Sequence, residues 1–306
     1  ERVHIIMLLK KWEQLPPEMQ TEEVRKFYDI LKKKQVSLFF KRMFDIVVSF
    51  LMLILLSPLF LILAIAIKLD SKGPVFYRQD RVTQYGRRFR IHKFRTMVQN
   101  ADKGSQVTVS NDSRITRVGK VIRNCRLDEI AQLIDVIQGT VTLVGVRPES
   151  TTYVAAYTPE MMATLLLPAG VTSLASILYK DEAKLLDAAD DTDKVYIEKI
   201  LPAKMYYNLK SIENFSFWGD IRIMFMTVFA VFGKEYRGEV SFAEEENIEK
   251  ISTKIIIRNR HPIPWHHVHR LSCQPFTDGF TKNYFQTDRT AGRTNRNGNF
   301  FHAFSD

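Results

Sequence analysis

Two adjacent carboxylates, Asp128 and Glu129, lie in the segment LDEIAQL, with Arg123 before them and Arg147 after them. A carboxylate can attack phosphorus through an acyl-phosphate intermediate, or it can hold a Mg²⁺ ion that offsets phosphate charge. Arginine guanidinium groups bind phosphate oxygens in pairs. These residue types together therefore suit phosphoryl transfer.

A plainer interpretation of the carboxylate pair stays open. Neighbouring residues of a helix point about 100° apart, so the two acids do not face each other as a retaining-glycosidase pair would. Acids near a helix N-terminus interact favourably with the helix dipole, and Arg123 or Arg126 can neutralise them. The chain has no GxxxxGK[ST], GxGxxG, HExxH or GxSxG motif that would favour another enzyme class.

The elements that must position these residues follow from periodicity. Apolar residues at helical spacing predict an amphipathic helix over 127–138 that ends at Gly139. The run VTLVGV after it predicts a strand or extended segment, and Pro148 keeps Arg147 out of helical geometry. Upstream, residues 72–97 alternate enough to predict two short strands around a turn at Tyr85-Gly86.

Residues 72–97 also mix many cations with aromatic side chains. Alone, this composition is typical of a nucleic-acid surface. Beside a membrane segment it favours a patch for lipid phosphate and phosphorylated substrate. The formal charge of +10 and the pI near 9.5 likewise indicate an anionic partner.

An uncharged block at residues 46–67 is about 33 Å long as a helix, enough for a bilayer's hydrocarbon core. Lysines and arginines flank both ends, so the positive-inside rule draws both ends to the cytoplasm. Ser57-Pro58 lies in the middle, where proline removes a backbone hydrogen bond and the serine hydroxyl can satisfy a freed carbonyl. We therefore expect a broken, re-entrant helix rather than a kinked span or a buried core helix.

The remaining segments are less informative. The pattern of residues 7–36 predicts an amphipathic helix with Thr21 as its N-cap. The lysine-rich end of this helix either rests on anionic headgroups or packs on its own domain. Residues 159–176, 180–212 and 215–233 are expected to be mainly helical, and Met7 is expected to be the true start. The chain has two cysteines with no CxxC pairing, which fits a reducing, cytoplasmic setting. From about Glu239 we expect a disordered tail, with a zinc site as the weaker alternative at His266, His267, His269 and Cys273.

Six ordered motifs also carry a family resemblance: KRMFDIVVSFLMLILLSPLFL, GPVFYRQDRV, KFRTM, SRITRVGKVIR, LDEIAQL and LVGVRPE. Over about residues 39–235 the chain resembles the bacterial sugar transferases, monotopic polyprenyl-phosphate phosphoglycosyl transferases that start capsule, exopolysaccharide and glycan assembly. With the periodicities above, the expected fold is α+β and mainly helical. We expect an N-terminal amphipathic segment (1–38), a re-entrant membrane helix (39–72), a small cytosolic catalytic domain with a short β element (73–238) and the tail (239–306). The resemblance implies the cytoplasmic face of the bacterial inner membrane.

The resemblance also implies residue roles. Asp128 would attack the β-phosphate of a UDP-sugar and release UMP, and undecaprenyl phosphate would then accept the phosphosugar. Glu129, with Asp128, would position Mg²⁺ or the acceptor, although Glu129 could instead only cap a helix and Arg95 only pin the fold. Phosphate and substrate binding would fall to Arg123, Arg147, Lys93, Arg95, Pro148 and Glu149.

Two positions depart from the family pattern. Ala131 stands where proline is common, and Asp135 stands where asparagine is usual, so the charge of Asp135 would weaken phosphate binding if it pointed into the site. Two rival functions follow: a membrane-anchored protein that binds anionic lipid or nucleic acid without chemistry, and a degenerate transferase that serves as an assembly partner. On the enzyme interpretation no nucleic acid is involved, and downstream glycosyltransferases are possible partners.

Overall fold

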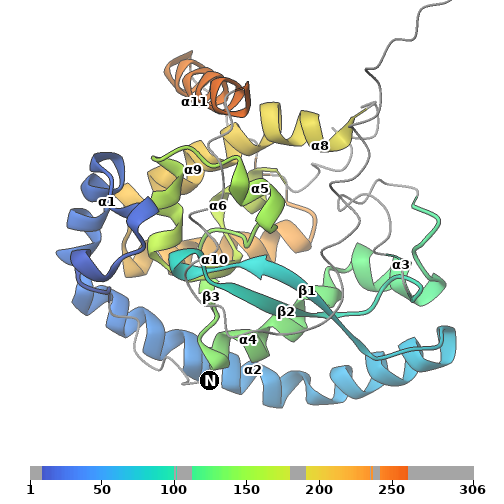
Figure 1. The fold of residues 1–306 in the computed structure, drawn as a ribbon. Coiled ribbons are helices and arrows are strands. Elements are labelled where there is room, and N and C mark those ends of the chain that lie inside the picture. Colours follow the sequence, from blue (N-terminus) through green and yellow to red (C-terminus); the bar gives the residue numbers. More distant parts are fainter. Residues whose placement is uncertain are drawn as a thin grey trace, which may run out of the picture. The chain divides into compact units, whose positions relative to one another are not determined.

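The computed structural model describes residues 9–99, 101, 112–179, 191–234, 236 and 242–260, and helices dominate them (Figure 1). Met7 and the candidate zinc residues lie outside these ranges. Short 3₁₀ turns η1 (Trp12–Gln14) and η2 (Pro17–Met19) precede α1 (Glu22–Lys32). The Thr21 side chain accepts a hydrogen bond from the Val24 amide, which confirms the predicted cap. Four residues of α1 are buried, so this helix packs on its own domain.

The long helix α2 (Gln35–Asp70) is continuous through Pro58. The prediction that the helix breaks at Ser57-Pro58 was therefore wrong. The Ser57 hydroxyl donates to the Ile54 carbonyl at 2.8 Å, which is the carbonyl that Pro58 cannot reach for want of an N–H. This local replacement keeps the helix intact. Figure 1 shows α2 curving along one side of the other elements. By length and composition α2 is able to cross a membrane.

Strands β1 (Phe76–Val82) and β2 (Arg88–Phe94) form the predicted antiparallel hairpin, with η3 (Gln84–Gly86) as its turn. Next come α3 (Arg117–Asn124), the 3₁₀ turn η5 (Leu127–Ala131) and α4 (Gln132–Gln138). The helix predicted over 127–138 is therefore confirmed, although its first turn is 3₁₀. Gly139 ends it in the left-handed region, with φ of 81°.

A second sheet pairs β3 (Val141–Val144) in parallel with β4 (Ala169–Thr172). The prediction of mainly helical structure was wrong for β4, because its pairing partner lies far away in the sequence. Gly170 makes this pairing possible, since a Cβ there would stand 2.2 Å from the backbone of Gly145.

Helices make up most of the described residues in the C-terminal half. Residue 242 begins a helix, so the predicted disorder from Glu239 was wrong for 242–260. The elements are α5 (Thr151–Ala155), η6 (Met161–Leu166), α6 (Leu174–Leu178), α8 (Thr192–Val195), the π-helical turn η7 (Tyr196–Ile200), α9 (Leu201–Glu213), α10 (Phe217–Val231) and α11 (Phe242–Arg260).

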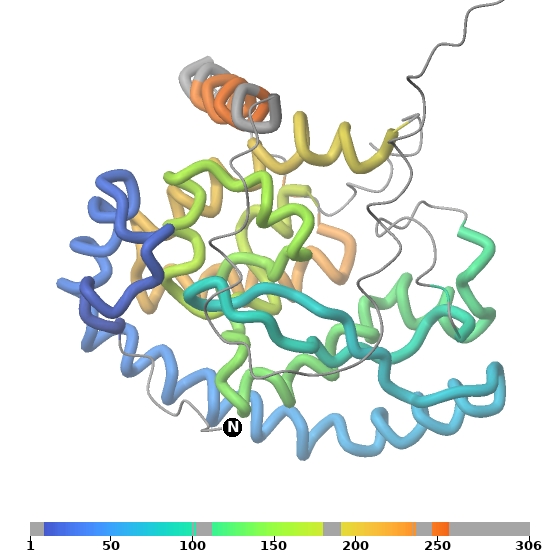
Figure 2. Tube along the Cα trace, viewed as in Figure 1, coloured from blue at the N-terminus to red at the C-terminus, as the bar shows by residue number. Residues whose placement is uncertain are grey.

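Three apolar clusters hold these elements together. The first joins the N-terminal segment to η6, α9 and Ile255 of α11, and the tube view shows these chain-distant segments beside one another (Figure 2). The second packs α3, β2 and η5 against the second half of α2, through residues such as Leu63, Phe94 and Ile122. The third packs α4 and β3 against the first half of α2. Both halves of α2 are therefore part of the domain's packing.

Candidate active site

Glu129 lies where β2, η5 and the segment after β3 meet. Arg147 places both terminal guanidinium nitrogens on its carboxylate, with Nη1 donating to Oε2 at 3.0 Å and Nη2 donating to Oε1. Lys93 Nζ lies 3.6 Å from Glu129 Oε1. Three of the predicted site residues, from three separate elements, are thus brought together.

Asp128 differs from its neighbour. In the part of the chain that the structure describes, no hydrogen bond or ion pair engages its carboxylate. Burial raises the pKa of Asp128 above its ordinary value, the Glu129 charge raises it further, and Lys93, Arg123 and Arg147 pull it back down. Arg123 on α3 therefore also acts on this site.

The same charges keep Glu129 ionised. Burial alone works against its charge, but Arg147 and Lys93 hold the pKa of Glu129 well below its ordinary value. Burial lowers the pKa of Lys93, and the Glu129 charge opposes that shift. The pair is therefore asymmetric, with one carboxylate bound by cations and the other without a hydrogen bond or ion pair to any described residue.

The site lies against the long apolar helix α2. Leu127 and Ile130, which flank the two acids, join the apolar cluster that includes Leu59, Phe60 and Leu63 of α2. Ala131 is fully buried in that cluster, so the missing proline is replaced by a residue that fills the core. The segment that carries the carboxylate pair is thereby packed on the second half of α2.

Arg95 lies at the C-terminal end of α2 rather than at the carboxylates. Its guanidinium donates to the carbonyls of Lys72 at 2.5 Å and Ser71 at 2.7 Å. Cations at a helix C-terminus satisfy carbonyls that have no partner within the helix. These contacts support the interpretation in which Arg95 pins the fold.

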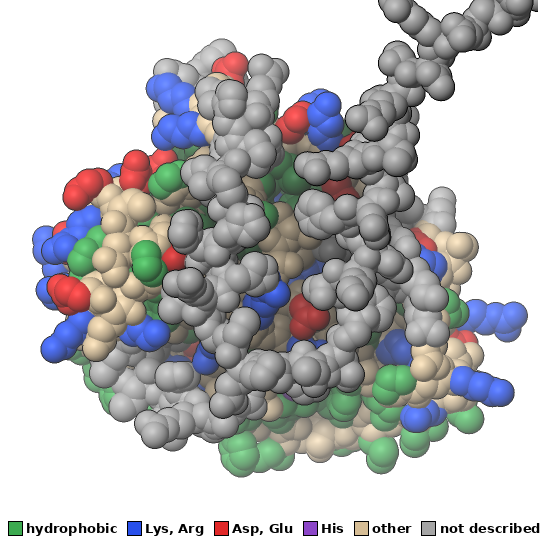
Figure 3. All heavy atoms as spheres, in the orientation of Figure 1, with side chains coloured by type: hydrophobic (Ala, Val, Ile, Leu, Met, Phe, Trp, Pro, Cys, Tyr) green, Lys and Arg blue, Asp and Glu red, His purple; other side chains and the backbone are tan. Residues whose placement is uncertain are grey.

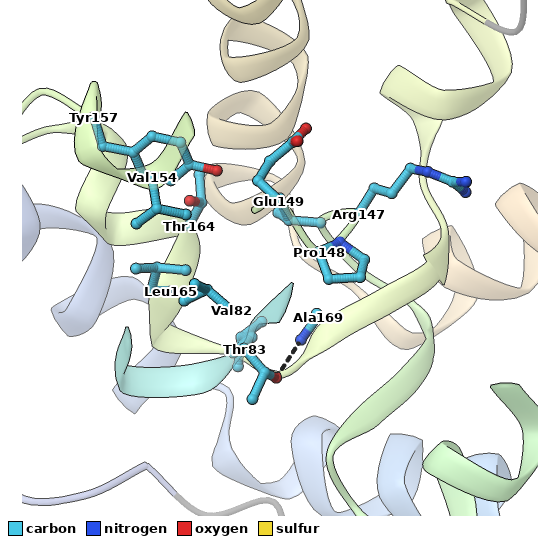
Figure 4. A pocket seen from close by; sticks show the side chains of 12 residues that line it. Val82, Thr83, Arg147, Pro148, Glu149, Val154, Tyr157, Thr164, Leu165 and Ala169 are labelled. Carbon is cyan, nitrogen blue, oxygen red and sulfur yellow. Dashed lines mark hydrogen bonds between the residues drawn. The ribbon is translucent and has the colours of Figure 1, made fainter. Parts of the chain in front are cut away.

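Pro148 and Glu149 line a hollow behind the site (Figure 4). The hollow measures about 10 Å³, which is room for roughly one water molecule and far too little for a nucleotide sugar. The Glu149 carboxylate is turned away from Arg147 in Figure 4. It accepts hydrogen bonds from Tyr196 Oη at 2.6 Å and Lys204 Nζ at 3.4 Å. These contacts do not place Glu149 at a substrate.

Asp135 does not point at the carboxylate pair. Its Oδ2 accepts the backbone N–H of His92 at 2.8 Å, and its Oδ1 lies 2.7 Å from Nδ1 of the same residue. Arg78 Nη1, which can only donate, lies 2.6 Å from His92 Nε2. The ring therefore carries its proton on Nδ1 and donates it to Asp135. The charge of Asp135 is used to join α4 to β2.

Sequence reasoning missed three residues close to this network. Arg81 of β1 acts on the charges of both Lys93 and Glu149, and it was visible only as one of many cations. Tyr196 and Lys204 bind Glu149 from about 50 positions away, and no local pattern marks them.

The residues present fit a magnesium ion only in part. Mg²⁺ is usually held by one or two carboxylates together with substrate phosphates. Asp128 and Glu129 supply such a pair, although Arg147 occupies both oxygens of Glu129. The described residues contain no group of three or more His, Cys, Asp or Glu side chains suited to a metal. The donor set therefore suits an ion that arrives with a diphosphate.

Comparisons with known proteins relate the chain to sugar-phosphate transferases. The chain is 40% identical over 194 residues to a UDP-N-acetylgalactosamine-undecaprenyl-phosphate N-acetylgalactosaminephosphotransferase of Aeromonas hydrophila, covering 62% of this chain and 43% of the relative. It is 37% identical over 203 residues to a UDP-glucose:undecaprenyl-phosphate glucose-1-phosphate transferase of Klebsiella pneumoniae, and the match covers 64% of this chain and 41% of the relative. A transferase of the same name from Caulobacter vibrioides is 35% identical over 193 residues, and the match covers 61% of this chain and 68% of the relative.

The matched part of the chain spans about two fifths of the length of the first two relatives. A protein-family model described as bacterial sugar transferase matches residues 36–234, which include α2, the carboxylate pair and the segment carrying Arg147. By this match the chain belongs to the bacterial sugar transferase family.

Proposed function

We propose that this protein transfers a sugar-1-phosphate from a UDP-sugar to undecaprenyl phosphate, which yields an undecaprenyl-diphosphate sugar and UMP. The observation that carries the proposal is the Asp128 carboxylate, which no described residue engages in a hydrogen bond or ion pair, beside the cation-bound Glu129 in a chain of this family. The relatives' names, which specify UDP-sugars and undecaprenyl phosphate, support the substrate classes.

In the first step an Asp128 carboxylate oxygen attacks the β-phosphorus of the donor. The bond from that phosphorus to the bridging oxygen breaks, and UMP leaves with the bond's electrons. Lys93, Arg123 and Arg147 bind the phosphate oxygens and offset the growing negative charge. A Mg²⁺ ion held through Asp128 and Glu129 would offset the diphosphate charge.

In the second step a phosphate oxygen of undecaprenyl phosphate attacks the phosphosugar on Asp128. The acyl-phosphate bond breaks and the free carboxylate is restored, so no proton donor is required. The product is the first lipid-linked intermediate of exopolysaccharide, capsule or glycan synthesis, and downstream glycosyltransferases would extend it.

The packing of α2 supports a monotopic protein on the cytoplasmic face of the inner membrane. Near the start of α2, Lys34 Nζ donates to the Phe215 carbonyl. At its end, Asp70 accepts the Val118 amide at 3.0 Å, and Arg95 caps the helix. A helix tied at both ends to one cytosolic domain has both ends on one side, so we propose that α2 enters and leaves the bilayer from the cytoplasm.

The outward face of α2 is suited to lipid. Its exposed side chains include Phe40, Phe50 and Leu55, and Figure 3 shows hydrophobic side chains along the edge that α2 forms. Exposed apolar residues of α10 add to it, including Trp218 at 77% exposure. An apolar groove of about 610 Å³ lies between the starts of these two helices. Apolar surface of this extent is typical of membrane contact.

The test is UMP release by the full chain in nanodiscs containing undecaprenyl phosphate, with Mg²⁺ and a panel of UDP-sugars. We expect release with at least one donor, and a phosphosugar adduct on Asp128 by mass spectrometry when the acceptor is omitted. Asp128→Asn should lower the rate at least 1,000-fold, on the order expected for loss of a nucleophile. Asp29→Asn, a matched change at an exposed ion pair, should leave the rate unchanged.

A wild-type protein that binds lipid but releases no UMP with any donor would be a binding protein or an assembly partner. An active Asp128→Asn variant would show that another group attacks phosphorus.

A further inference from the structure

The buried pair of Lys204 and Glu149 lies outside the reaction steps above. Lys204 of α9 and Glu149 are 4% and 7% exposed as side chains, and Nζ lies 3.4 Å from Oε1. Tyr196 of η7 joins both, since its hydroxyl donates to Glu149 at 2.6 Å and accepts from Lys204 at 2.8 Å. Burial works against the Glu149 charge, yet Lys204 and Tyr196 hold the pKa of Glu149 below its ordinary value. The group is therefore a charged cluster inside the domain.

Such a cluster is a poor choice for stability alone. Burying two charges costs several kcal/mol each, and apolar residues of the same volume are often at least as stabilising. A charged cluster does, however, hold its side chains in fixed positions, because each buried charge has few alternative partners. The part of the chain that the cluster fixes is the part that follows β3.

That segment, 145–149, is held at both ends. At its start the Gly145 amide donates to the Thr172 carbonyl at 2.9 Å, and the Val146 carbonyl accepts from Gly170 at 2.7 Å. At its end the Glu149 carbonyl accepts the Val82 amide of β1 at 3.0 Å. The Glu149 side chain adds an anchor in α9 and η7. Arg147 lies between the two anchored ends.

Arg147 and Glu149 extend in different directions on either side of Pro148 (Figure 4). Proline restricts the backbone of the residue before it as well as its own φ. A shift of Glu149 is therefore passed to Arg147 rather than absorbed between them. Because Arg147 binds Glu129 with two nitrogens, a small displacement would break a two-point contact.

We propose that Lys204 and Tyr196 are positioning residues for the transfer reaction, which act through Glu149 to hold Arg147 at the carboxylate pair. The inference rests on the proposed function and adds two residues to it. Neither residue touches the reacting atoms, and both act through the backbone of 147–149.

The test compares Tyr196→Phe with wild type in the UMP-release assay. The variant keeps the ring that packs at 4.5 Å on Tyr153 and removes only the hydroxyl shared by Glu149 and Lys204. We expect kcat/KM for the UDP-sugar to fall about ten-fold, corresponding to about 1.4 kcal/mol. Tyr28→Phe is the matched control, because Tyr28 is also buried and donates to the Lys10 carbonyl at 2.9 Å. Tyr28→Phe should lower the melting temperature about as much as Tyr196→Phe does, but it should leave kcat/KM for the UDP-sugar unchanged.

A double-mutant cycle separates positioning from general stability. In an Arg147→Ala background, adding Tyr196→Phe should change kcat/KM less than two-fold, because the residue it positions is gone. Equal ten-fold losses in both backgrounds, or no loss in either, would overturn the inference. Lys204→Met should behave like Tyr196→Phe, and Tyr196→Phe carries the test alone if the lysine variant does not fold. Failure of the wild-type assay with every donor would instead refute the proposed function.

Discussion

The two neighbouring acids have different surroundings because, among the described residues, the fold brings cations into direct contact with Glu129 and not with Asp128. Glu129 receives Arg147 and Lys93, and the pKa of Glu129 is held low as a result. Burial raises the pKa of Asp128, and no described residue engages its carboxylate in a hydrogen bond or ion pair. A nucleophile needs an accessible lone pair, so this asymmetry favours Asp128 for that role.

Glu149 gives a pH-dependent prediction. The pKa of Glu149 in the folded protein lies below its ordinary value of 4.5, so its ionised form adds stability above about pH 4.5, and that stability is lost as pH falls toward the folded pKa. Glu149→Gln should cost about 3–5 kcal/mol at pH 7, because it leaves Lys204 buried without its anion. Chemical unfolding of both proteins at pH 7 and pH 4 measures the difference, which should shrink at pH 4. A constant difference would contradict the ion-pair explanation.

Asp135→Asn should leave donor kinetics unchanged, because Asp135 faces His92 and not the carboxylate pair. An asparagine oxygen can still accept one of the two His92 hydrogen bonds, so the unfolding free energy should fall by only about 1–2 kcal/mol. Steady-state kinetics with the preferred UDP-sugar and a thermal melt check both points. A changed KM for the donor would mean that the Asp135 charge reaches the substrate.

At the scale of elements, α2 is a scaffold for the domain, and it is also long and apolar enough to cross a membrane. Arg42, which is buried, donates to the carbonyls of Val136 at 2.7 Å and Ile137 at 3.2 Å, so it caps the end of α4. Lys41 reaches Asp220 of α10 at 2.7 Å. These charged residues lie on the face of α2 toward the domain, together with part of its apolar residues, and the exposed apolar residues lie on the other face. The helix therefore packs on the segment that carries the carboxylate pair through one face and leaves an apolar face exposed.

This arrangement predicts the accessibility of both ends of α2. Single cysteines replacing the exposed Lys33 or Lys72, in a background with Cys125→Ser and Cys273→Ser, should both resist an impermeant maleimide in intact spheroplasts. Both should react after the membrane is opened. Labelling of one end in intact cells would show that α2 spans the bilayer.

At the scale of the molecule, apolar surface is used in two ways. In the first cluster the N-terminal segment and Ile255 of α11, which lie outside the family-matched region 36–234, pack with α9 and η6, which lie inside it. The outward faces of α2 and α10 remain exposed. Stability and membrane contact should therefore respond to different substitutions.

Phe27→Ala should destabilise the folded protein by about 3–5 kcal/mol, because Phe27 is 2% exposed within the first cluster. Phe40→Ala, at 59% exposure, should change the unfolding free energy little and weaken membrane association. Chemical denaturation and vesicle flotation measure the two effects. Equal destabilisation by both variants would contradict this division of the surface.

Much of this organisation followed from local sequence patterns. The Thr21 cap, the hairpin around Tyr85-Gly86, the helix end at Gly139 and the apolar block each depend on interactions within a few residues, or on composition. The ordered motifs also indicated the family that the comparisons support. These features are short-range, and so the sequence by itself determines them.

The tertiary structure decided which charges meet. Only the fold places Arg147 on Glu129, turns Asp135 to His92, moves Arg95 to the end of α2 and buries Lys204 beside Glu149. β4 likewise exists because β3 lies beside it. Each of these contacts joins residues more than 15 positions apart, and the free energy of such contacts depends on burial and geometry that no local pattern specifies.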